Sequence, residues 1–285
     1  INALAINDQE EIVDYFGGIE DLEREIIRCV GNPMERFNED ALRMMRAVRF
    51  AGQLGFTIES DTFNAIRTLK ANLERVAVER MKVEFEKMIL SPHRALAFKA
   101  FVESELYHSC PDFKEAKETL LKLGEFPLEK MTITQAWILF AYYEQLTVPQ
   151  LRKVLKDWKS SNDQISTILT GYQTLLARLE KEWDAFLAYE CPEVLAIEVE
   201  QLLPGIGHSE QLVELEKVYQ QLPIRSMKDI QIDGFGVKEA LGLEKMGPII
   251  GEVLQALQTE ILSGGLPNEN AEIVSWIRNN FNESK

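Results

Sequence analysis

Four charged residues recur at intervals of three: Asp40, Arg43, Arg46 and Arg49. On a helix of 3.6 residues per turn, this spacing predicts a polar stripe that drifts slowly around the axis. A carboxylate beside a guanidinium presents an acceptor next to a planar set of donors, which matches the edge of a nucleobase, and further arginines bind phosphate oxygens. The stripe therefore predicts a nucleotide-binding helix. Spacing alone leaves open the alternative of a solvated face held by an Asp40–Arg43 ion pair.

Charge is distributed unevenly along the 285 residues, whose net charge is −15. Residues 1–23 carry seven acids and no base, residues 24–99 carry 14 bases and 10 acids, residues 100–178 carry 9 and 10, and residues 179–285 carry 8 and 19. The segment that contains the arginines is the only positive one. In the acidic last segment, we expect any RNA contact to depend on shape and backbone amides rather than on a broad basic surface.

The elements that must position the arginines are predicted from the spacing of apolar residues, which changes from strand-like to helical near residue 21. Residues 2–7 and 11–16 are short apolar stretches around a polar turn, which predicts a β-hairpin that Gly17 and Gly18 end. An isolated hairpin is marginal in water, so its strands are expected to belong to a sheet whose other members are absent. Beyond this point the apolar spacing becomes helical.

Helical periodicity continues almost to the end of the chain. Asn32-Pro33 is typical of a helix entry, and the sequence predicts one amphipathic helix that carries the arginines and ends near Gly55. Residues 61–73 and 78–89 predict two more helices. The rest alternates helical stretches with turns, and glycine and proline become dense after residue 229. The fold class is therefore mainly α.

Other kinds of chemistry find little support. The chain has three cysteines, Cys29, Cys110 and Cys191. Because they are odd in number and far apart, we expect reduced thiols in the core and neither a disulfide framework nor a zinc site. The three histidines are isolated from acidic partners at ligand spacing. The four tryptophans have the spacing of helix-core or helix-cap aromatics. No apolar run approaches the roughly 20 residues that cross a bilayer, so we expect a soluble, cytoplasmic protein without a membrane partner.

Several motifs together resemble those of class II tRNA nucleotidyltransferases, and in particular of bacterial CCA-adding enzymes. The family's neck motif is matched by Val30-Gly31-Asn32-Pro33, Arg36-Phe37 and Glu39-Asp40-Ala41-Leu42-Arg43-Met44-Met45-Arg46-Ala47-Val48-Arg49-Phe50. Upstream, Asn2-Ala3-Leu4-Ala5 is similar to the end of its Arg-Arg-Asp motif, and Asp14-Tyr15-Phe16-Gly17-Gly18 is similar to its head-to-neck hinge. Downstream, the tail is matched by Asp229-Ile230, Gly234, Gly247-Pro248-Ile249-Ile250-Gly251-Glu252, Gly264-Gly265-Leu266, Asn268-Glu269 and Trp276.

The resemblance implies the addition of CCA to the 3′ end of tRNA, with CTP and ATP as substrates. Asp40 and Arg43 would read the base, because cytosine and adenine both offer an amine donor and a ring-nitrogen acceptor. Arg46 and Arg49 would support the base, the ribose or the triphosphate. The resemblance also implies that three residues support the neck, namely Glu39, Arg80 and Glu84, and that a turn in the tail contacts tRNA, namely Gly247, Pro248 and Gly251.

The resemblance also implies a division of the chain. Residues 1–23 would be the hairpin remnant of an α/β catalytic head, residues 24–93 the neck with the nucleotide-selecting helices, residues 94–178 a helical body, and residues 179–285 a helical, tRNA-binding tail of an elongated molecule. The family's phosphate loop and metal-binding carboxylates would lie upstream of Ile1, so Mg²⁺ would be bound by the missing head. The chain has no Asp-x-Asp after a glycine-rich strand, and we expect it to be inactive alone.

Rival functions remain open at this point. An enzyme that adds only the terminal A and a poly(A) polymerase relative share the neck motif. A non-catalytic RNA-binding scaffold would fit if the native chain begins at Ile1. The sequence is compatible with either a monomer or a homodimer.

Overall fold

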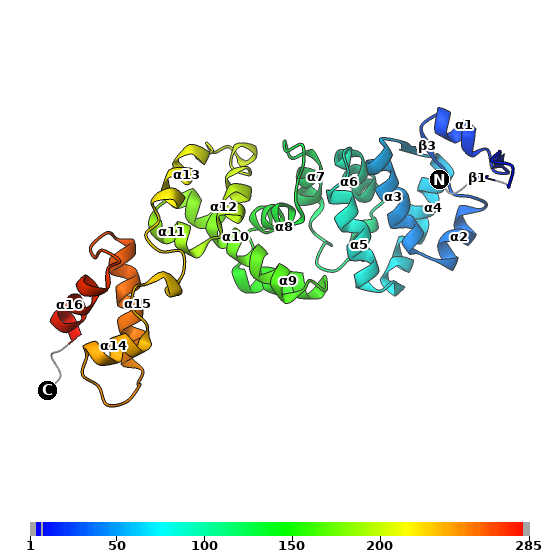
Figure 1. Ribbon diagram of the computed structural model, residues 1–285. Coiled ribbons are helices and arrows are strands. Elements are labelled where there is room, and N and C mark those ends of the chain that lie inside the picture. The colour runs from blue at the N-terminus through cyan, green and yellow to red at the C-terminus, as the bar shows by residue number, and fades with distance from the viewer. Residues whose placement is uncertain (1–3, 7, 282–285) are drawn as a thin grey trace. The chain divides into compact units, whose positions relative to one another are not determined.

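The structure is a computed structural model that describes residues 4–6 and 8–281 (Figure 1). Asn2 and Ala3, which were expected to begin the first strand, lie outside the described residues. The chain divides into two compact units. The first runs to Gln173 and includes Pro204–Gly207, and the second comprises Thr174–Leu203 and the residues from His208 onward.

The first unit begins with the predicted hairpin, which the structure confirms. Strand β1 (Leu4–Ile6) pairs antiparallel with β2 (Ile12–Asp14), with Ala5 opposite Val13. A second pair is parallel and very short, and joins β3 (Ile26–Ile27) to β4 (Thr57–Ile58). The mainly α fold class is confirmed as well.

The helices of the first unit begin and end as follows: α1 (Gly18–Glu23), α2 (Pro33–Glu39), α3 (Leu42–Leu54), α4 (Ser60–Leu69), α5 (Val78–Ile89), α6 (Arg94–Glu103), α7 (Lys117–Glu125), α8 (Ile133–Tyr143) and α9 (Val148–Asp157). Helix α10 (Asn162–Glu180) starts in the first unit and ends in the second. Short 3-10 helices cover Lys70–Arg75, Leu106–Ser109 and Pro204–Ile206.

One predicted helix is in fact two. Asn32 and Pro33 do form a helix entry, in which the Asn32 side chain accepts from the Met34 amide, but they begin α2 and not the helix of the arginines. Helix α2 ends at Glu39, and Asp40 is extended, with φ −147° and ψ 101°. The arginine helix α3 begins at Leu42. No glycine or proline marks this break, which explains why the sequence pattern did not reveal it.

Helix α3 is held on two sides within the first unit. Against α6 the backbones approach closely, because a Cβ placed on Gly52 would lie 2.6 Å from the Ala97 Cβ. On the side of α5, the buried Arg49 of α3 pairs with the buried Glu84 of α5. These contacts fix the position and rotation of α3, since a packed core tolerates little change in volume.

The second unit contains α11 (Ala185–Glu190), α12 (Glu193–Glu200), α13 (Leu212–Gln221), α14 (Gly234–Ala240), α15 (Ile249–Leu262) and α16 (Asn270–Phe281), with a 3-10 helix at Met227–Asp229. Its most buried charge is Glu200, which is 0% exposed. That carboxylate accepts hydrogen bonds from Arg178 Nε at 2.7 Å, Trp183 Nε1 at 2.6 Å and the Gln211 amide at 2.6 Å. Three donors satisfy a charge that burial would otherwise make costly.

Candidate functional site

The arginines of the predicted stripe on α3 differ in how far they are buried. Successive arginines are three residues apart, so each lies about 60° further round the helix than the last. Arg43 and Arg46 are partly exposed, whereas Arg49 is 7% exposed and turned inward. Arg49 donates hydrogen bonds from Nε to Glu84 of α5 and from Nη1 to Gln53. Arg49 and Glu84 therefore form a buried ion pair between α3 and α5.

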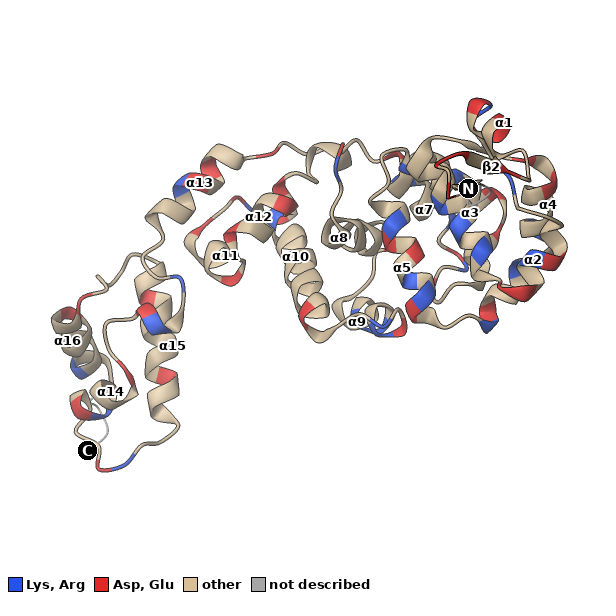
Figure 2. Ribbon diagram, turned by 45° about the vertical axis from the view of Figure 1, so that its right-hand side comes forward, with Lys and Arg blue, Asp and Glu red and all other residues tan. Residues whose placement is uncertain are grey.

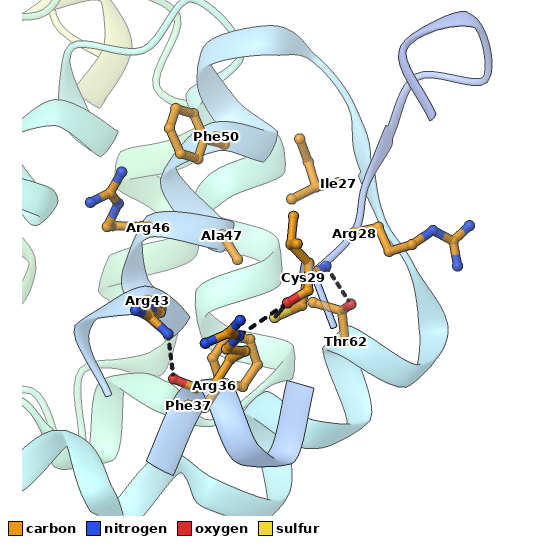
Figure 3. Close-up of a pocket in the computed structure, with 11 residues that line it drawn as sticks. Ile27, Arg28, Cys29, Arg36, Phe37, Arg43, Arg46, Ala47, Phe50 and Thr62 are labelled. Atoms are coloured by element: carbon orange, nitrogen blue, oxygen red, sulfur yellow. Dashed lines mark hydrogen bonds between the residues drawn. The ribbon is translucent and has the colours of Figure 1, made fainter. Parts of the chain in front are cut away.

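A cavity of about 410 Å³ lies beside the outer arginines (Figure 3). It opens between α3 and the segment that follows β3. Among the described residues that line it, four are arginines and none is an acid: Arg28, Arg36, Arg43 and Arg46. The lining also includes the Phe50 ring, but it does not include Asp40 or Arg49. A cavity with this charge suits a phosphorylated ligand with a flat ring.

The four arginines are not equally available. Arg28 donates to Asp21 and Glu59, and it points away from the other lining side chains (Figure 3). Arg36 and Arg43 share the Glu39 carboxylate, at 3.0 and 2.9 Å. Within the described part of the chain, Arg46 has no carboxylate partner, and its guanidinium carbon lies 5.9 Å from the centroid of the Phe50 ring. Arg46 is thus the cation that is most readily available to a ligand.

Asp40 and Arg43 do not pair with each other. Asp40 accepts from the Leu42 amide at 3.2 Å and from Arg80 of α5 at 3.1 Å. Arg43 donates to Glu39 and, at 3.2 Å, to the Arg36 carbonyl. The Asp40–Arg43 ion pair that the alternative interpretation required is absent.

Glu39 is the carboxylate partner of two arginines that line the cavity. The pKa of the Glu39 carboxyl lies below its usual range, mainly because of the hydrogen bond from Arg36 and next because of the one from Arg43. Each of the three predicted support residues thus bonds a residue of the predicted site: Glu39 to Arg43, Arg80 to Asp40, and Glu84 to Arg49. Their role as supports, like that of the nucleotide contacts, remains a prediction.

Cys29 was expected to be a core thiol, and that expectation was wrong. Cys110 and Cys191 are buried, but Cys29 is only partly buried and lines the cavity, where its amide donates to Thr62 Oγ1 at 3.1 Å. Desolvation is the main cause that raises the pKa of the Cys29 thiol. Its location follows from the end of β3 two residues earlier, a boundary that spacing did not reveal.

The predicted tail residues lie at the start of α15. Pro248 is exposed at the N-cap position, one residue before the helix begins. A Cβ placed on Gly247 or Gly251 would meet nothing within 4 Å. Neither glycine is therefore needed for a close approach of another helix.

Two family models match this chain. One, described as "tRNA nucleotidyltransferase domain 2", matches residues 128–277, and the other, "Probable RNA and SrmB-binding site of polymerase A", matches residues 55–117. The CCA-adding enzyme of Enterococcus faecalis is 37% identical over 279 residues, which are 98% of this chain and 68% of the relative. This chain belongs to the bacterial class II CCA-adding enzyme family.

Other members of the CCA-adding enzyme family agree with this assignment. The Limosilactobacillus reuteri enzyme is 37% identical over 277 residues, 96% of this chain and 68% of its own length. Among solved structures, the Bacillus stearothermophilus CCA-adding enzyme in complex with CTP superimposes with a TM-score of 0.88 at 29% identity, over 98% of this chain and 71% of that one. The chain thus spans about two thirds of the length of these relatives.

Two further observations concern the described residues alone. Residues 4–6 and 8–281 contain no group of three or more His, Cys, Asp or Glu side chains arranged to hold a metal ion, so they do not fit the Mg²⁺ that the family resemblance implies. None of their helices is both long and apolar enough to cross a membrane.

The geometry predicts different consequences for neighbouring arginines of this family member. Arg49→Met leaves Glu84 buried without its partner, so we expect the free energy of unfolding to fall by about 3 kcal/mol. Arg46→Met, on the cavity wall, should change it by no more than about 0.5 kcal/mol. Urea unfolding followed by far-UV circular dichroism measures both. Equal losses in the two variants would contradict the structural role of Arg49.

Proposed function

We propose that this chain is the nucleotide-selecting and tRNA-binding part of an enzyme that adds CCA to the 3′ end of tRNA, with CTP and ATP as substrates. The observation that carries the proposal is the cavity lined by four arginines on α3 and its neighbours, in a chain that matches CCA-adding enzymes over 98% of its length. The cationic lining suits a triphosphate, and the ring of Phe50 suits a base or a ribose.

Base selection is proposed for Asp40 and Arg43. Cytosine and adenine present an exocyclic amine donor and a ring-nitrogen acceptor on one edge, which one carboxylate and one guanidinium can satisfy together. Guanine and uracil present donors and acceptors in the opposite order. Both side chains are already held by hydrogen bonds, Asp40 to Arg80 and Arg43 to Glu39, so each is oriented before a base arrives. Such preorganisation lowers the entropic cost of binding.

Alkylation of Cys29 reports occupation of the cavity. The other two thiols are buried. Because the pKa of Cys29 is raised, its thiolate forms at a higher pH than that of an ordinary thiol, and its reaction with iodoacetamide becomes faster as the pH rises. At alkaline pH we expect millimolar CTP and ATP to slow the reaction more than GTP and UTP do. Arg43→Ala should abolish the difference between bases.

Tripolyphosphate serves as the control for that experiment, because it fills the phosphate positions without a base. It should protect Cys29 to the same extent in the wild type and in Asp40→Ala. If all four nucleotides protect Cys29 equally in the wild type, then Asp40 and Arg43 do not select the base.

Phosphoryl transfer is proposed to need residues that this chain does not contain. Transfer of this kind depends on a divalent metal bridging the attacking and leaving oxygens, and the sequence has no pair of aspartates two residues apart. We therefore expect the purified chain to add no labelled CMP or AMP to a tRNA that lacks its terminal CCA. The measurement is gel analysis of the tRNA after incubation with labelled CTP or ATP and Mg²⁺. Incorporation above that of a heat-denatured sample would disprove this part.

The turn before α15 is proposed to contact tRNA. The open space around Gly247 and Gly251 lets an RNA backbone approach the start of the helix. Nearby apolar side chains are unusually exposed, Phe235 by 68% and Met246 by 53%, and a base could stack on them. The acidic composition of this segment agrees with contacts made through shape rather than through bulk charge.

A charge placed at Gly251 tests this contact. Gly251→Glu puts a carboxylate where the phosphate would lie without disturbing any neighbour, so we expect tRNA to bind about tenfold more weakly in fluorescence anisotropy. Thr259→Glu adds the same charge two turns further along α15, on an exposed position, and should leave the affinity unchanged. Equal weakening by both substitutions would argue for a general charge effect and against a contact at Gly251.

A further inference from the structure

Two cations on helix α9 and one in the turn that follows it, here called the α9 stripe, have no ion-pair partner among the described residues. All three are exposed: Arg152 and Lys156, four residues apart, lie on one face of the helix, and Lys159 lies two residues beyond its end at Asp157. In the described part of the chain none of them has a carboxylate within ion-pair distance. Lys153 differs, because it is bonded to Asp112 at 3.1 Å and Asp157 at 2.5 Å.

The stripe stands out against the charge of the molecule. Residues 148–160 contain four bases and one acid, a net charge of +3 in a chain whose net charge is −15. Figure 2 shows basic residues on α3, α5 and α9 in the first unit. The adjacent face of α9, about 100° further round the helix, buries Leu151 and Leu155, and Trp158 is buried directly after the helix. The helix therefore cannot rotate, and it presents its two cations to solvent in fixed positions.

The backbone at Lys159 adds an independent observation. The chain leaves α9 by a turn in which the Ser160 amide donates to the Leu155 carbonyl and the Lys159 amide to the Lys156 carbonyl, each at 2.9 Å. This is the helix-ending motif in which glycine is the usual residue at the left-handed position. Lys159 occupies that position with φ 56°. The turn thus fixes the backbone from which the Lys159 side chain extends beyond the end of α9.

We propose that Arg152, Lys156 and Lys159 bind consecutive phosphates of a tRNA strand. The inference rests on the proposed function, since the polyanion is the tRNA substrate. Arg152 and Lys156 are displaced by about 6 Å along the helix axis, Lys159 follows in the turn that ends the helix, and such a group of cations can bind a sugar–phosphate backbone without reading its bases. The surface lies outside residues 55–117, the part matched by the RNA-binding family model.

The test measures binding of a labelled tRNA to the 285-residue chain by fluorescence anisotropy over a range of salt concentrations. The variant Arg152→Gln/Lys156→Gln/Lys159→Gly should bind about tenfold more weakly at low salt, and the slope of log K against log salt should fall by about 2. The matched control Lys117→Gln/Lys122→Gln/Lys130→Gln makes the same change of charge on α7 and the following loop. It should bind as the wild type does.

A single substitution separates the charge from the backbone. Lys159→Gly relieves the strained turn, so Tm should rise by about 1–4 °C while tRNA binding weakens about twofold. Gln145 ends α8 in the same motif, with φ 51° and its amide donating to the Tyr142 carbonyl. Gln145→Gly should raise Tm in the same way without any effect on tRNA.

The outcomes are distinct. If the wild type binds tRNA and the α9 triple variant binds equally well, the inference is overturned and the proposed function stands. Equal weakening by the α7 control overturns it as well, because net charge then explains the result. If the α9 variant loses binding to polyglutamate but not to tRNA, the stripe serves an acidic protein instead. A wild type that binds no tRNA overturns the proposed function together with the inference.

Discussion

The buried ion pair between Arg49 and Glu84 decides which side of α3 meets the cavity. A charge that is 7% exposed is tolerated only next to its partner, so the helix cannot turn about its axis without separating the two. The geometry of 3.6 residues per turn then sets the directions of the other arginines. With Arg49 fixed inward, Arg43 and Arg46 both line the cavity, and Arg46 lies near the Phe50 ring. Residues that look equivalent in the sequence thus differ in burial and in partners because they point in different directions from the helix axis.

A second constraint acts where α2 ends. Glu39 is the last residue of that helix, and Asp40 is extended, so two adjacent carboxylates point to different partners. Glu39 bonds Arg36 and Arg43, whereas Asp40 bonds Arg80. The break therefore separates the acid that orients the arginines from the acid proposed to read a base.

Much of the fold followed from patterns in the sequence. The hairpin and helix α5 appear where apolar spacing and turn residues predicted them, because these signals are local. The break at Asp40 was missed, since neither glycine nor proline accompanies it. Nor could spacing show that Arg49 is buried and Cys29 partly exposed, because both depend on contacts with residues more than 30 positions away. The motif was enough to indicate the family, whereas the different burial and partners of its arginines could be seen only in the structure.

Glu200 has a consequence for the dynamics of the second unit. Its carboxylate, at the end of α12, accepts from Arg178 and Trp183 at and just beyond the end of α10, and from Gln211 at the start of α13, so it joins three stretches of chain. Opening any one stretch would leave a buried anion short of a donor, so the three are coupled energetically. Their backbone amides should therefore exchange hydrogen with deuterium in concert, as one cooperative substructure, and this corner of the molecule would resist the piecemeal fraying that is common where short helices meet.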